Sequence, residues 1–212
     1  MLIFLHGFLG CPADWEPLLT DDSIALELPG HGKEPFNPDI AGSLKKRIPP
    51  GTHHLVGYSA GGRVALQLKA RYPDAFDKLL IFSAHPGLHS AEEREARWKQ
   101  DQPWIKLLEE GDLKHFIRKW YEQPLFAMLK KDAAFYKKRM QHDPAGLAAF
   151  MRAFSLGKHE PPPLFPGTHF VAGAQDLKYA AFSHTLIPHA GHALLQEAPE
   201  VCRGIIRSWF YE

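Results

Sequence analysis

A serine flanked by glycines is the first feature of this sequence that could do chemistry. Residues 57–61 read Gly-Tyr-Ser-Ala-Gly, with Ser59 at the centre. Between a strand and a helix, the pattern G-x-S-x-G presents a serine hydroxyl on a sharp turn at the edge of a sheet. The glycines on either side allow the strand and the helix to pass closely. A serine in an ordinary glycine-rich turn would not need this setting, so we expect Ser59 to be catalytic.

A catalytic serine needs a partner that takes its proton. In this setting the expected chain order is serine, then aspartate or glutamate, then histidine. Asp176 follows an apolar run at 170–172, and His192 follows a shorter one at 186–187. His192 is chosen from 13 histidines because it satisfies the order, the loop position and a preceding glycine. Asp143 is a rival for Asp176, but it lies in a helical region.

Two backbone N–H groups should stabilise negative charge that develops near the serine. One belongs to Ala60, directly after Ser59, and the other to Phe8, in the loop after the first apolar run. His6 and His31 lie in similar glycine-containing loops, and we expect them to form structural hydrogen bonds. The sequence has neither an H-E-x-x-H motif nor a pair of neighbouring cysteines, so it predicts no metal or cofactor site.

The elements that must position these residues follow an alternating pattern. Short apolar runs predict buried parallel strands at 2–5, 24–28, 54–56, 79–82, 170–172 and 186–187. Helical spacing follows at 63–72 and again at 199–210. Such alternation predicts an α/β fold, with a mainly parallel sheet covered by helices on both faces.

The middle of the chain differs, because it shows helical spacing and no convincing strand. Candidate helices cover 92–99, 104–109, 113–120, 133–141 and 144–155, and three prolines at 161–163 form a stiff connector. We therefore predict a core of residues 1–84 and 161–212, with a helical lid at 85–160 over the carboxyl ends of the strands. Bound substrate should slow hydrogen exchange in this lid around 98–126.

The composition limits the partners. Lys plus Arg is 25 and Asp plus Glu is 24, so no global field attracts nucleic acid or an anionic membrane. No stretch approaches the roughly 20 apolar residues of a membrane span. The two cysteines, Cys11 and Cys202, suit a reducing compartment, and we expect a cytoplasmic protein. The sequence carries no signal for an oligomeric state.

Several segments resemble one family. Residues 5–10 (LHGFLG) with Asp14-Trp15, 28–32 (LPGHG) and 57–63 (GYSAGGR) are typical of α/β hydrolases. Residues 85–88 (HPGL), 95–98 (EARW), 120–126 (WYEQPLF) and 173–179 (GAQDLKY) resemble the 2-succinyl-6-hydroxy-2,4-cyclohexadiene-1-carboxylate synthases of menaquinone biosynthesis. The resemblance spans nearly the whole chain. The link between Asp176 and His192 is short for that family and leaves little room for a helix.

The resemblance implies a lyase reaction. Ser59, activated by His192, would remove a proton from 2-succinyl-5-enolpyruvyl-6-hydroxy-3-cyclohexene-1-carboxylate, and 1,4-elimination of pyruvate would follow. Residues that would bind this small polycarboxylate are implied at Tyr58, Arg63, Arg97, Trp120 and Arg139. Independently, Arg63 lies one helical turn after Ser59 and can face the same cleft, and arginine binds carboxylates through two parallel hydrogen bonds.

Two other functions stay open at this point. The same triad would serve a carboxylesterase or a carbon–carbon bond hydrolase, with water as the second nucleophile. The third possibility is a binding protein that has kept the fold and lost catalysis. The complete Ser, Asp and His set argues against this last function.

Overall fold

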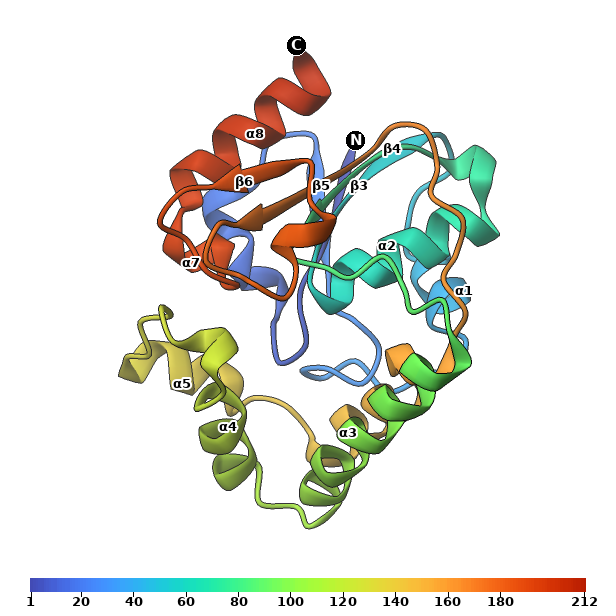
Figure 1. Cartoon of the computed structure of the whole chain (residues 1–212). Helices are drawn as coiled ribbons and strands as arrows, with labels where there is room; N and C mark the ends of the chain where they lie inside the picture. The colour runs from blue at the N-terminus through green and yellow to red at the C-terminus, as the bar shows by residue number, and fades with distance from the viewer.

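The computed structural model describes residues 1–212 and contains one six-stranded sheet in which every strand is parallel to its neighbours. The strand order is β2-β1-β3-β4-β5-β6, which places β3 near the middle (Figure 1). The bounds are β1 Leu2–Leu5, β2 Ser23–Leu26, β3 His53–Tyr58, β4 Phe76–Phe82, β5 Thr168–Gly173 and β6 Thr185–Ile187. All six predicted strands are present, and the α/β fold class is confirmed.

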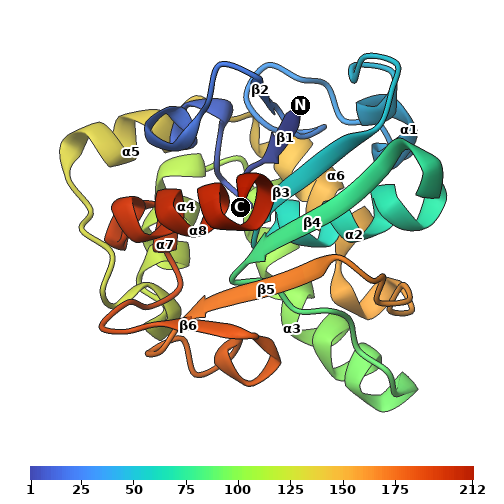
Figure 2. The same ribbon diagram turned by 90° about the horizontal axis from the view of Figure 1, so that it is seen from above.

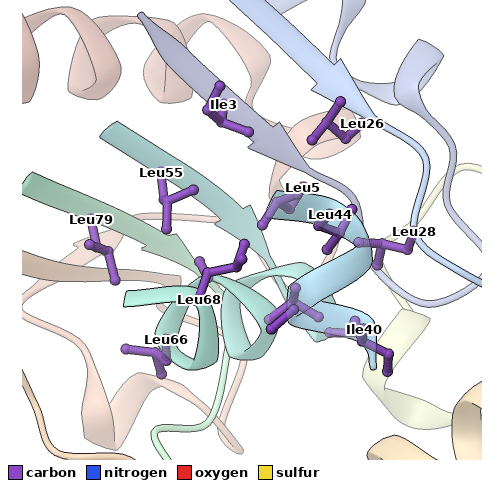
Figure 3. Packing of buried hydrophobic residues seen from close by; sticks show 14 of the residues in the cluster. Ile3, Leu5, Leu26, Leu28, Ile40, Leu44, Leu55, Leu66, Leu68 and Leu79 are labelled. Atoms are coloured by element: carbon purple, nitrogen blue, oxygen red, sulfur yellow. The ribbon is translucent and has the colours of Figure 1, made fainter. Parts of the chain in front are cut away.

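The sheet is apolar on both faces, as expected for parallel strands covered by helices. Alternate side chains such as Ile3, Leu55 and Leu79 pack with α1 (Ile40–Lys45) and α2 (Ala60–Arg71), and Figure 3 shows this cluster. Full burial of one such side chain contributes about 1.5–3 kcal/mol. This core fixes α2, and with it the turn that carries Ser59, on the sheet.

The opposite face is covered by the end of the chain. Phe4, Val56 and Leu80 pack there against Cys202 and Ile206 of α8 (Pro199–Tyr211). Figure 2 shows α8 on one side of the strands and α1 with α2 on the other. The short α7 (Leu194–Glu197) precedes α8. Short 3-10 turns lie at Pro12–Asp14, Glu16–Leu18, Pro73–Ala75, Pro124–Phe126, Leu156–Lys158 and Ala180–Phe182.

Four helices lie between β4 and β5 and form a cap. They are α3 Ala91–Glu109, α4 Leu113–Tyr121, α5 Ala133–Arg139 and α6 Pro144–Phe154. In Figure 1, α3, α4 and α5 gather on the side of the molecule away from α8. A third cluster, including Phe116, Phe126 and Leu147, gives the cap its own apolar core.

The prediction of two separate helices at 92–99 and 104–109 was wrong. A single helix, α3, covers both ranges and contains Pro103. Proline removes a helical hydrogen bond at a cost of about 3 kcal/mol, but the buried Ile105 and Leu108 hold the second half against the cap core. The N-terminus of α3 is also stabilised, because Ser90 and Glu93 form a reciprocal capping box. Packing and capping together outweigh the local break.

No helix of the structure is both long enough and apolar enough to cross a membrane.

Candidate active site

The turn between β3 and α2 holds Ser59 in a strained backbone conformation. Its φ of 51° lies in the left-handed region that costs a non-glycine residue about 1–2 kcal/mol. The Ser59 N–H is held by the Phe82 carbonyl at 2.8 Å. A Cβ on Gly61 would lie 2.2 Å from the Leu5 carbonyl oxygen, so only glycine permits this close crossing. The strain is therefore maintained by the packing of the helix on the strands.

Ser59, His192 and Asp176 are in contact. The Ser59 hydroxyl lies 3.2 Å from His192 Nε2, and His192 Nδ1 lies 2.7 Å from Asp176 Oδ2. The carboxylate can only accept, so Nδ1–H donates to it and Nε2 is left to accept the serine proton. His192 and Asp176 are each 2% exposed. This is the geometry of a serine made reactive by an oriented base.

The short link between Asp176 and His192 does not prevent this contact. It contains only the 3-10 turn Ala180–Phe182 and strand β6, without an α-helix. Asp176 lies in a tight turn after β5, where its N–H bonds to the Gly173 carbonyl at 3.0 Å. The two loops therefore meet at the carboxyl ends of adjacent strands.

Glu197, which was not predicted from the sequence, holds the loop around His192. Its carboxylate accepts from the Gly191 N–H at 2.5 Å and from the Ala193 N–H at 3.3 Å. One side chain thus fixes the backbone on both sides of His192. A glutamate five residues after a Gly-His loop was the only sequence signal.

The loop after β1, residues 7–14, lies against the serine, and we call it the oxyanion loop. A Cβ on Gly7 would lie 3.4 Å from Ser59 Cβ and 2.8 Å from the Tyr58 ring. Phe8 makes no backbone hydrogen bond through its N–H, and the Ala60 N–H is at the first position of α2, where helical N–H groups are free. Phe8 and Ala60 line the same cavity as Ser59, and the role of their N–H groups stays a prediction.

A cavity of about 150 Å³ lies between this site and the cap, and Ser59 and His192 line it. Aromatic side chains form much of its wall. Tyr58 lies 5.5 Å from the His192 ring, and Trp120 lies 5.1 Å from the Phe8 ring, both measured between centroids. The structure thus brings Tyr58 and Trp120 to the same cavity as the triad, from the core and the cap respectively.

Two of the predicted arginines reach this cavity with donors to spare. Arg63 uses Nη1 to bond the Phe154 carbonyl at 2.7 Å, and Arg97 uses Nε to bond Asp101 at 2.8 Å. Asp101 also accepts from Ser155 at 2.7 Å. Burial and the nearby Arg97 lower the pKa of Arg63 to about 10, so it keeps its charge at neutral pH. The remaining N–H groups of both guanidiniums are available to an anion.

Lys178 adds a positive charge beside these arginines and His85 adds a neutral imidazole, and neither was predicted. Both line the cavity. Burial, Lys178 and Arg97 lower the pKa of His85 to about 4, and burial and Arg97 lower that of Lys178. Both lie in segments that resemble the synthase family, 85–88 and 173–179, but nothing in those segments alone assigns them a role.

Arg139 differs from Arg63 and Arg97 because its guanidinium is paired with a buried carboxylate. Its Nη1 is 3.0 Å and 2.9 Å from the two carboxylate oxygens of Asp14, and the residue is 4% exposed. Burial opposes its charge, but Tyr121 and Asp14 raise the pKa of the guanidinium. Arg139 lines the cavity with its charge already neutralised by a protein carboxylate, so its assignment to substrate stays a prediction.

His6 and His31 are buried beneath the oxyanion loop. His6 donates from Nδ1 to the Gly7 carbonyl at 2.8 Å and accepts at Nε2 from the Leu28 N–H at 3.0 Å. The His31 ring lies edge-on to Phe150 at 4.7 Å. Both positions are structural. No group of three or more His, Cys, Asp or Glu side chains is arranged to hold a metal ion.

The parallel sheet, the strained serine turn and the Ser–His–Asp contacts define an α/β hydrolase with a helical cap. The chain matches the family described as the alpha/beta hydrolase family over residues 2–204. Within this class, the chain belongs to the family of the 2-succinyl-6-hydroxy-2,4-cyclohexadiene-1-carboxylate synthases.

The similarity to members of that family is close to full length. The synthase of Enterobacter sp. (strain 638) is 32% identical, over 93% of this chain and 86% of its own length. That of Escherichia coli O1:K1 is 32% identical, over 98% and 91%. The solved structure of MenH from S. aureus is similar with a TM-score of 0.85 and 25% identity, covering 98% of this chain and 92% of that one. The epoxide hydrolase CorEH, at 14% identity and a TM-score of 0.76, shares the fold.

Proposed function

We propose that this protein eliminates pyruvate from 2-succinyl-5-enolpyruvyl-6-hydroxy-3-cyclohexene-1-carboxylate and leaves 2-succinyl-6-hydroxy-2,4-cyclohexadiene-1-carboxylate. The relatives named as synthases of that product support the reaction. The observation that carries the proposal is the Ser59–His192–Asp176 contact at the end of a cavity that also holds free arginine donors. A proton-abstracting group beside an anion site is what this elimination requires.

The first step is removal of the ring proton next to the succinyl ketone. The Ser59 hydroxyl gives its proton to His192 Nε2, and the serine oxygen takes the ring proton. The electron pair of the broken C–H bond moves onto the ketone oxygen, giving an enolate that the Phe8 and Ala60 N–H groups would bind. Such preorganised donors contribute several kcal/mol when they meet charge that develops during the reaction.

Collapse of the enolate completes the elimination. The carbonyl re-forms, the electron pair makes a new ring double bond, and the existing ring double bond shifts by one position. This shift breaks the bond between the ring carbon and the enolpyruvyl oxygen. The leaving enolpyruvate takes the proton held by His192 and becomes pyruvate, so Ser59 and His192 regain their starting states.

Binding would rest on the cations of the cavity. Arg63 and Arg97 have free guanidinium donors, and Tyr58 and Trp120 provide flat surfaces against the ring. Arg139 would contribute to the same wall next to its partner Asp14.

The cavity of about 150 Å³ is below the 300–1,000 Å³ common for ligand pockets. The cap would therefore move when substrate enters, which supports the expected change of hydrogen exchange at 98–126.

The setting proposed for this reaction is the cytoplasm, where Cys11 and Cys202 stay as thiols.

The test is to incubate the purified protein with the enolpyruvyl precursor and follow pyruvate with a coupled dehydrogenase. We expect pyruvate release, together with slow or absent turnover of p-nitrophenyl esters. Rapid ester turnover without pyruvate release would instead favour the carboxylesterase function.

A further inference from the structure

The oxyanion loop is held in place by the cap as well as by the core. Leu9, next to Phe8, has a φ of 61°, the left-handed conformation that leucine avoids. Its side chain is fully buried in the cap cluster with residues such as Phe116 and Leu147. A residue keeps such a conformation only when its surroundings fix it on several sides. For Leu9, the surroundings come from the cap.

His142, between α5 and α6, makes the second contact. Its Nε2 lies 3.0 Å from the Leu9 carbonyl, and its Nδ1 accepts from the Gly32 N–H at 2.8 Å. The Gly32 N–H fixes Nδ1 as the acceptor, so Nε2 carries the proton and donates to Leu9. His142 is 6% exposed, and burial lowers its pKa to about 4, which keeps the ring in this neutral form.

The Arg139–Asp14 ion pair makes the third contact, at the other end of the loop. Asp14 also accepts from the Cys11 N–H at 3.1 Å, so its carboxylate links the loop backbone to α5. The neighbouring Lys138 reaches the Ala13 carbonyl at 3.4 Å. The Phe8 ring itself lies between His31 of the core and Trp120 of the cap.

We propose that His142 is a positioning residue of the active site. Its bond to the Leu9 carbonyl holds the Leu9–Gly10 peptide, which lies two peptide units after the Gly7–Phe8 peptide that carries the Phe8 N–H. By fixing Leu9 in its left-handed conformation, His142 restrains the direction of the Phe8 N–H toward charge that develops beside Ser59. The oxyanion hole is then complete only when the cap is docked. The inference rests on the proposed function for the reaction that it serves, but the contacts themselves can be tested without that reaction.

Two isosteric substitutions separate the contacts of His142. In His142→Asn, the amide oxygen takes the place of Nδ1 and keeps the Gly32 bond, but the donor to Leu9 is lost. In His142→Gln, the amide nitrogen takes the place of Nε2 and keeps the Leu9 bond, but the acceptor for Gly32 is lost. His89→Asn, at an exposed position of the cap, is the matched control.

Three readouts compare the variants: the rate at which a fluorophosphonate labels Ser59, kcat and KM for pyruvate release, and hydrogen exchange at Gly10. The Gly10 N–H bonds to the Gly7 carbonyl at 2.9 Å and reports directly on the loop. We expect His142→Asn to slow labelling and kcat about tenfold, with KM little changed and Gly10 exchange faster. His142→Gln should stay within about threefold of wild type, and His89→Asn should match it.

A merely structural role would affect His142→Asn and His142→Gln alike, because each loses one buried hydrogen bond. Equal slowing in both, or no slowing in either, overturns the inference. If the labelling pattern holds but the wild-type protein releases no pyruvate from the precursor, the proposed reaction fails and the role of His142 stands.

Discussion

The core and the cap position their functional groups in different ways. In the core, Ser59, Asp176 and His192 follow β3, β5 and β6, so the hydrogen bonds of the sheet place their backbones at one edge. In the cap, the position of Arg97 is fixed by a side-chain contact, the ion pair with Asp101. The proposed chemistry therefore depends on strand geometry, whereas the binding proposed for the cap depends on a contact between side chains. Substitutions in the two regions should lead to different kinds of loss.

The largest effect should come from the core. Ser59→Ala and His192→Ala should each reduce kcat by about 10³-fold or more, because proton transfer by a positioned group contributes about 10²–10⁴-fold and the two residues act as a unit. The double variant should be no slower than the single ones. The melting temperature of Ser59→Ala should stay near that of wild type.

Ser43→Ala, which changes a helix serine away from the site, is the control for this comparison. If both triad variants kept wild-type activity, the core would have no part in catalysis.

The second effect comes from His142, which joins the cap to the core, and it is a loss of folding stability at acidic pH. The pKa of His142 is about 4 in the folded protein, against about 6.5 in the unfolded chain. Between these values the unfolded state binds a proton that the folded state does not, so stability falls as the pH falls from about 6.5 to about 4. The loss due to His142 should amount to roughly 3 kcal/mol.

His142→Gln cannot take up this proton, so its stability should decline less steeply over the same range. Urea unfolding at several pH values between about 4 and 7 measures the difference. The buried His31 remains in both proteins, and burial, the largest cause of its lowered pKa, acts in both, so only the part of that shift due to His142 differs between them. Parallel curves for the wild type and His142→Gln would show that the histidine carries no proton linkage.

The third effect should come from the cap and the facing helix. Arg63→Gln and Arg97→Gln should each lower kcat/KM about 10- to 100-fold, mostly through KM, since a hydrogen bond to a charged group contributes about 1.5–3 kcal/mol. Arg152→Gln removes an exposed arginine of the cap that pairs with Glu109, and it should leave kcat/KM unchanged. If Arg63→Gln and Arg97→Gln changed kcat/KM no more than Arg152→Gln does, neither arginine would bind the substrate.

The smallest effect should come from Glu197, whose contacts with the His192 loop lie one step away from the chemistry. Glu197→Gln keeps the size of the side chain. Its amide NH₂ group cannot accept a hydrogen bond, so one of the two backbone N–H groups, of Gly191 or Ala193, loses its acceptor. We expect kcat to fall about tenfold, equivalent to about 1.4 kcal/mol, with KM little changed. Glu200→Gln in α8 is the matched control, because Glu200 pairs only with the exposed Arg203. A larger loss in the control would contradict this role.

Most of the core could be predicted from the sequence because its signals are local. The strand–turn–helix setting of Ser59 lies within a few residues, and the loops of Asp176 and His192 each follow an apolar run. The surroundings of these groups could not be predicted, since they depend on distant contacts. Arg139 meets Asp14 across 125 positions and His142 meets Leu9 across 133, and no local pattern encodes either pair.

The helices of the cap also could not be predicted fully from local sequence. Pro103 predicts a break, yet α3 is continuous because Ile105 and Leu108 pack into an apolar core assembled from other helices. Glu197 and Lys178 were missed for a related reason. A charged residue in a loop or short helix is normally solvated, and only its tertiary neighbours reveal another role.

Cleavage of the ring C–H bond by the Ser59–His192 pair is tested most directly with a precursor deuterated next to the succinyl ketone. In single-turnover experiments the deuterated precursor should release pyruvate more slowly than the ordinary one, since that bond breaks in the first chemical step. Equal rates, with the deuterium kept in the ring product, would mean that pyruvate leaves without this proton being removed, for instance by hydrolysis of the enolpyruvyl group, and would contradict the proposed elimination.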